Sequence, residues 1–162
     1  MKKIISIFLL FFVFMSFNSC ALAAGATLFD IRNKIYEESK ELRPLLDDPK
    51  DAILANNMWD TCIIVTTQLD AYFSMLGILN TVKDKNLTEV SVDYLIDWLN
   101  DTRTKNQTNI KALEDTSVAR GKTTKKHMEK LKAHLEELDQ LLEDELEKIY
   151  IVVKALKIRQ PQ

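Results

Sequence analysis

Two histidines are the side chains in this sequence best suited to proton transfer or metal binding. They are His127 and His134, seven residues apart. On one helix they would share a face but lie about 10.5 Å apart along the axis. That separation is too large for both rings to bind one small metal ion. We therefore interpret them as histidines at the edge of an apolar helix face, beside Leu131 and Leu138.

The sequence lacks the short motifs by which several enzyme classes are recognised. It contains no Gly-x-Ser-x-Gly, no glycine-rich phosphate loop, no His-Glu-x-x-His and no Cys-x-x-Cys-His. The spacing of the residues indicates neither a nucleophile paired with a general base nor a set of metal ligands. We expect a non-enzymatic protein that uses no cofactor and no metal.

A polar stretch interrupts the apolar face that Leu95 and Leu99 begin. We call it the polar seam, and its members are Thr102, Asn106 and Asn109. A buried amide without partners costs about 1–3 kcal/mol, so these groups must be matched, hydrated or exposed. One interpretation is a small-ligand pocket between helices, with His134 at the same level. The alternative is that the seam rotates, Ile110 takes its place and the polar residues face water or fix the helix register.

A haem site is the more specific form of the ligand hypothesis. If the second and fourth predicted helices run parallel, Met58 and His134 each lie about three turns from the start of their helix. A methionine and a histidine at one level of a helical bundle can ligate haem iron. The sequence offers no additional small residues that would make room for a porphyrin.

The fourth predicted helix begins with a basic segment, which precedes a strongly acidic stretch. Its cations are Arg120, Lys122, Lys125, Lys126 and Lys130. Lysines at a helix N-terminus oppose the helix dipole, which suggests a use such as docking on an acidic partner or on anionic lipid. The alternative is a solvated face whose charge is offset by Glu37, Glu38 and Glu41.

The composition indicates one helical domain to position these groups. The chain has 162 residues, a formal charge of −2, 46% hydrophobic residues, and only 3 glycines and 3 prolines. This balance excludes a fully disordered chain, and so few glycines cannot supply the turns of a β-sandwich or barrel. The near-neutral charge argues against nucleic acid as a partner.

Helix boundaries follow from local signals. Asp48 before Pro49 predicts the start of a second helix that runs to about Asp84, because aspartate caps and proline fits the first turn. Arg120-Gly121 predicts the end of a third helix, and Thr123 or Thr124 opens the fourth. Apolar residues repeat every three or four positions in the second and fourth helices. We predict an all-α, elongated antiparallel up-down bundle of three long helices plus one short N-terminal helix.

The N-terminus has the pattern of an export signal. Lys2 and Lys3 precede an apolar run over residues 4–17, and Ala21-Leu22-Ala23 fits a signal-peptidase site. We predict a signal peptide over residues 1–23 and a single domain over residues 24–162. Acylation of Cys20 as a lipoprotein, or an uncleaved N-terminal anchor, are the alternatives.

Cleavage at that site would leave Cys62 as the one remaining cysteine, so packing alone must hold the domain. Its apolar neighbours predict that Cys62 is buried. We expect a periplasmic or extracellular protein that acts through an unknown protein partner or as a structural component of the cell envelope. Peripheral contact with the membrane surface is compatible with this expectation. The alternative function is binding of a small ligand or haem at the polar seam.

Overall fold

The computed structural model describes residues 28–79, 81 and 85–158, and the side chains of residues 28–79, 81 and 90–154. Within these residues the chain is all-helical, with four α-helices and no strand. The N-terminal helix covers residues 28–42, and the others are α2 (Ala52–Leu79), α3 (Lys85–Ala112) and α4 (Lys122–Ile158). Two short 3-10 helices, η1 (Arg43–Leu45) and η2 (Thr116–Val118), lie in the connections. The prediction of an all-α chain with four helices is confirmed. The predicted signal peptide lies outside the described residues.

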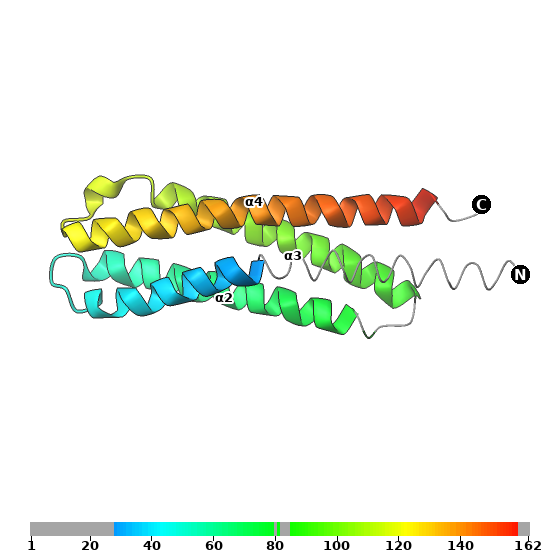
Figure 1. Cartoon of the computed structure of the whole chain (residues 1–162), viewed down its shortest axis with the longest axis horizontal. Helices are drawn as coiled ribbons and strands as arrows, with labels where there is room; N and C mark the ends of the chain where they lie inside the picture. The colour runs from blue at the N-terminus through cyan, green and yellow to red at the C-terminus, as the bar shows by residue number, and fades with distance from the viewer. Residues whose placement is uncertain (1–27, 80, 82–84, 159–162) are drawn as a thin grey trace, which may run out of the picture.

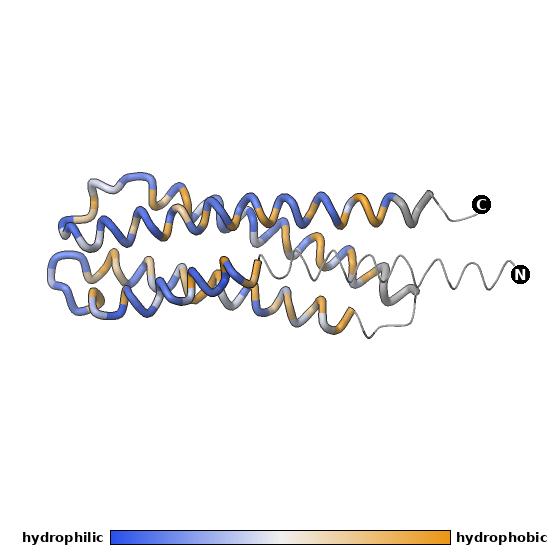
Figure 2. The backbone as a smooth tube through the Cα atoms, in the orientation of Figure 1, coloured by the Kyte–Doolittle hydropathy of each residue, from blue (hydrophilic) through white to orange (hydrophobic). Residues whose placement is uncertain are grey.

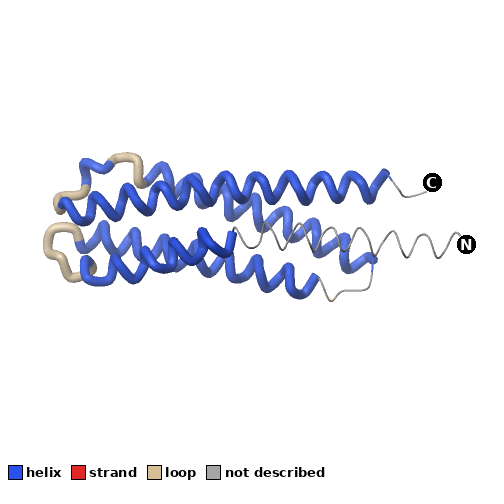
Figure 3. The backbone as a smooth tube through the Cα atoms, viewed as in Figure 1, coloured by secondary structure: helices blue, strands red, loops and turns tan. Residues whose placement is uncertain are grey.

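The four helices lie along one another, and each reverses the direction of the one before it (Figure 1). α3 packs against both α2 and α4. Ion pairs join the N-terminal helix to its neighbours, Arg32 to Asp70 of α2 at 2.7 Å and Lys34 to Glu137 of α4 at 2.8 Å. The connection into α2 and the connection from α3 to α4 lie at the same end of the molecule (Figure 3).

The helix α2 begins at Ala52, slightly beyond the start predicted at Asp48 and Pro49. The Asp48 carbonyl accepts from the Ala52 N–H at 2.8 Å, and its carboxylate accepts from the Lys50 N–H at 2.8 Å. Asp48 therefore stabilises the turn that leads into α2, but its side chain bonds a residue that precedes the helix. The helix ends at Leu79, and the end predicted at about Asp84 lies outside the described residues.

The predicted end of the third helix at Arg120-Gly121 is wrong. α3 ends at Ala112, and η2 and its flanking residues complete the connection to α4. Gly121 does not adopt the positive φ of a glycine C-cap. It permits a close approach instead, since a Cβ there would lie 2.9 Å from an Asp51 carboxylate oxygen. The glycine thus marks a contact with a residue 70 positions earlier, which local signals do not reveal.

The core is a continuous apolar stripe shared by the four helices. Figure 2 shows hydrophobic positions recurring along each helix, and α4 contributes Met128, Leu131, Leu135, Leu138 and Leu142, each fully buried. The predicted burial of Cys62 is confirmed, and that burial raises the pKa of its thiol to about 12. The thiol is therefore protonated and inert at neutral pH.

In the described chain, α2 alone is long and apolar enough to cross a membrane, judged by length and hydropathy. Only 33% of the qualifying stretch is buried.

Candidate functional site: an ionic cluster, a polar seam and a basic segment

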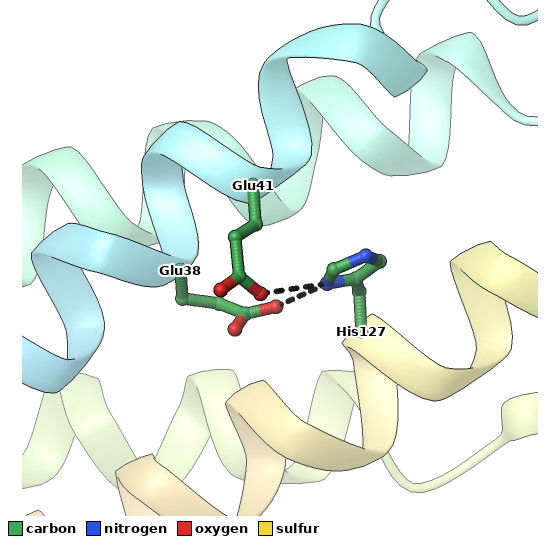
Figure 4. A group of neighbouring side chains, drawn as sticks. All are labelled: Glu38, Glu41 and His127. Atoms are coloured by element: carbon green, nitrogen blue, oxygen red, sulfur yellow. Dashed lines mark hydrogen bonds and ion pairs between the residues drawn. The ribbon is translucent and has the colours of Figure 1, made fainter.

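An ionic cluster lies between the N-terminal helix and α4. Glu38 and Glu41 are one turn apart on the first helix, and His127 and Lys130 are one turn apart on α4. The Glu38 residue is 0% exposed, and its Oε1 lies 2.6 Å from His127 Nδ1 (Figure 4). Two helices that face each other in register therefore bring four ionisable side chains together.

Lys130 joins the two carboxylates of the cluster. Its Nζ lies 2.7 Å from Glu38 Oε2 and 2.6 Å from Glu41 Oε2. The hydrogen bond from Lys130 holds the pKa of Glu41 below its usual value. Burial lowers the pKa of Lys130, but its bonds to Glu38 and Glu41 outweigh that effect and raise it. Lys130 therefore stays charged and neutralises a carboxylate that has no access to water.

The cluster also offers ligand atoms for a cation. One oxygen each from Glu38 and Glu41 and one nitrogen of His127 all lie within 4.8 Å of one another. A histidine nitrogen with two carboxylate oxygens can bind a divalent metal ion. The sequence alternative in which Glu38 and Glu41 offset the basic segment is borne out at Lys130. The sequence did not bring His127 to the same two acids, because its nearest acidic partner, Glu38, lies 89 residues away in the chain.

The polar seam is buried at two of its three positions. Thr102 is 3% exposed and Asn106 is 1% exposed, whereas Asn109 is half-buried. Asn106 Nδ2 donates to the Leu135 carbonyl of α4 at 2.7 Å. The Asn106 Oδ1 and Thr102 Oγ1 atoms are buried without a hydrogen-bond partner among the described residues. Thr102 and Asn106 therefore do not face water, as one form of the alternative required. The bond from Asn106 to Leu135 fits its other form, in which the seam fixes the helix register.

His134 is half-buried on α4, and burial lowers its pKa. It is therefore neutral at pH 7. No hydrogen bond among the described residues joins His134 to the polar seam, although Asn106 reaches the neighbouring residue Leu135. Met58, the second predicted haem ligand, is 1% exposed in the core of α2.

The basic segment divides into an exposed part and a paired residue. The side chains of Arg120, Lys122, Lys125 and Lys126 are exposed, and none forms an ion pair within the part of the chain that the structure describes. Lys130, which the sequence grouped with them, belongs to the ionic cluster. Its ammonium group is therefore already paired within the protein.

Asp51 compensates for the lysines at the start of α4. Its carboxylate oxygens accept hydrogen bonds from the backbone N–H groups of Arg120 at 2.9 Å and Gly121 at 2.6 Å. These bonds, the one from Arg120 foremost, hold the pKa of Asp51 below its usual value. Asp51 directly precedes the first residue of α2 in the chain. The structure shows that this carboxylate places a negative charge at the positive end of α4.

A second buried acid also escaped sequence reasoning. Glu145 of α4 is 3% exposed and accepts a hydrogen bond of 2.5 Å from the Tyr72 hydroxyl of α2. Burial raises the pKa of Glu145. The only sequence signal was a glutamate beside the core leucine Leu146, within a run of acidic residues.

Comparison with known protein families, curated proteins and solved structures yields no match to this chain.

Proposed function

We propose that the protein is an exported, non-enzymatic helical protein that acts through contact with an acidic protein partner in the cell envelope. In this proposal the chain forms an elongated antiparallel up-down bundle and serves as a rigid adaptor or structural component. The supporting observation is the exposed part of the basic segment, where Lys122, Lys125 and Lys126 form no ion pair within the described chain.

These lysines differ from Lys130 in their pairing. Lys122 and Lys125 lie in the first turn of α4, where a cation opposes the helix dipole by about 0.3–1 kcal/mol at low salt. Lys130 lies further along the helix and is paired with Glu38 and Glu41. Lys125 and Lys126 form no ion pair within the described chain, so their ammonium groups stay open to another molecule. An acidic surface on another protein would supply the missing partner.

Capture of envelope proteins tests this contact directly. The purified protein, carrying an affinity tag at its C-terminus, should retain a partner from detergent-solubilised envelope. Lys125→Glu combined with Lys126→Glu should abolish retention. Lys154→Glu is the matched control, because Lys154 is an exposed lysine toward the other end of the same helix. Equal retention by all three proteins would contradict the proposal.

Export is supported by the charged, apolar and small-residue regions at the N-terminus, which also predict where the chain is cut. N-terminal sequencing of exported material should begin at Ala24 or within two or three residues of it. An intact Met1 in the membrane fraction would contradict cleavage, and a modified Cys20 at the N-terminus would establish a lipoprotein.

A second candidate function is binding of a small polar ligand or haem at the polar seam. The observation that favours it is the pair of buried atoms without partners, Thr102 Oγ1 and Asn106 Oδ1, since such atoms carry a cost that a bound polar group would relieve. Haem binding predicts an absorbance band at about 410 nm in protein reconstituted with haemin. A spectrum identical to that of free haemin would exclude that form of the hypothesis.

A further inference from the structure

We propose that Glu38, Glu41 and His127 form a binding site for a divalent transition-metal ion of the zinc class, and that Lys130 holds the site until the metal displaces it. The proposal is independent of the protein contact proposed above. It rests on the burial of Glu38, on the convergence of three ligand atoms and on the partial exposure of Lys130, which allows this side chain to turn toward solvent.

Glu38 is a fully buried carboxylate, and a carboxylate without water requires positive charge beside it. Its Oε1 faces His127 Nδ1 at 2.6 Å, and its Oε2 faces the Lys130 ammonium at 2.7 Å. Each carboxylate oxygen of Glu38 thus faces a hydrogen-bond donor. The buried charge of Glu38 favours a cation beside it, and in this arrangement that cation is Lys130.

The three ligand atoms converge on one region between the N-terminal helix and α4 (Figure 4). His127 Nδ1 lies 2.6 Å from Glu38 Oε1 and 3.9 Å from Glu41 Oε2. Tetrahedral zinc with ligands at about 2.0–2.1 Å places neighbouring ligand atoms about 3.3 Å apart. The observed separations bracket that value, so side-chain shifts of less than about 1 Å would complete the site without moving either helix.

The metal has a route into the site. The Lys130 and Glu41 side chains are 38% and 51% exposed, whereas those of His127 and Glu38 are 13% and 0% exposed. Lys130 can swing into solvent on its flexible stem and remain charged there. Its departure leaves room for the metal, and a water molecule can supply the fourth ligand from the exposed side.

The ligand chemistry selects the class of metal. Imidazole nitrogen suits zinc, nickel and copper, whereas magnesium and calcium prefer sites made entirely of oxygen. A carboxylate oxygen can only accept a hydrogen bond, so the 2.6 Å contact places a proton on His127 Nδ1. Metal binding transfers that proton to solvent, or to Nε2 if the ring is neutral. Lys130 leaves with its own proton.

Calorimetric titration of the purified protein with Zn²⁺ at pH 7.5 tests the proposal. Wild-type protein should bind one Zn²⁺, and an equal concentration of Mg²⁺ should not compete. His127→Gln should weaken binding by at least about tenfold, a loss that even outer-shell changes produce at metal sites. His134→Gln is the matched control, one heptad away on the same helix, and should bind as wild type does.

Lys130→Met gives the most specific outcome. If the ammonium competes for the site, its removal should tighten Zn²⁺ binding by about tenfold or more, and Zn²⁺ should raise the melting temperature more than in wild type. Glu41→Gln, at a half-exposed position that tolerates substitution, should weaken binding even if Lys130→Met does not fold. No Zn²⁺ binding by wild type, equal binding by His127→Gln, or weaker binding by folded Lys130→Met would each overturn the proposal.

Discussion

Replacing Thr102 with valine isolates the cost of one buried hydroxyl in the polar seam. Threonine and valine share the same branching and nearly the same shape and helix propensity, so the change removes little besides the polar atom. Thr102 is 3% exposed, and its Oγ1 has no hydrogen-bond partner among the described residues. A hydroxyl buried in this way costs about 1–3 kcal/mol in proteins. We therefore expect Thr102→Val to raise the free energy of unfolding by about 1–2 kcal/mol.

Thermal and urea melts followed by circular dichroism measure this change. For a chain of this size the melting temperature should rise by about 3–8 °C. Thr104→Val is the matched control, because Thr104 is exposed on the same helix and donates to the Asn100 carbonyl at 2.9 Å. It should stay within about 0.5 kcal/mol of wild type. A Thr102→Val protein that is less stable than the control would refute the reasoning, since its hydroxyl would then have a partner such as a buried water.

Three further substitutions test the other buried polar groups. Asn106→Leu should stabilise the protein by about 1 kcal/mol and abolish any ligand binding at the seam, because an unpaired amide oxygen costs more than its one hydrogen bond contributes; chemical denaturation checks this. Burial raises the pKa of Glu145 above its ordinary 4.5, so its contribution to stability is present below pH 4.5 and is lost as the pH rises through the raised value. Glu145→Gln, which still accepts from Tyr72, should flatten that part of a stability–pH curve. Lys130→Met should lower the free energy of unfolding of the metal-free protein by roughly 1–3 kcal/mol, because it leaves the buried Glu38 with His127 alone; a urea melt that matches wild type would contradict this.

Local sequence signals predicted the elements of this fold well. The all-α class, the turn at Asp48 that leads into α2 and the burial of Cys62 each depend on residues within a few turns of one another. Periodicity placed Thr102 and Asn106 in line with Leu95 and Leu99 but left their burial open, and the structure shows that both are buried. In each case a short repeat or a capping residue carries the information, and the rest of the chain does not need to be known.

Contacts between helices could not be predicted in the same way. The pairing of Glu38 with His127 spans 89 residues, and the bond from Gly121 to Asp51 spans 70. Such contacts depend on how far each helix is rotated and shifted along its neighbour, which periodicity leaves undetermined. For the same reason the sequence assigned Lys130 to the docking surface, whereas the structure places it in the ionic cluster. The sequence also assigned Gly121 to a helix end, whereas the structure shows that it permits a close approach to Asp51.

Sedimentation of the protein with isolated envelope at two salt concentrations tests the proposed contact most directly. Exposed charges act over about 30 Å at 0.01 M salt but only about 8 Å at 0.15 M. Wild-type protein should sediment with the envelope at low salt and lose much of that association at 0.15 M. The protein carrying Lys125→Glu and Lys126→Glu should stay soluble at both concentrations and should melt at the wild-type temperature or higher, because acidic side chains suit a helix N-terminus. A folded variant that sediments as wild type does, at both salt concentrations, would contradict the account.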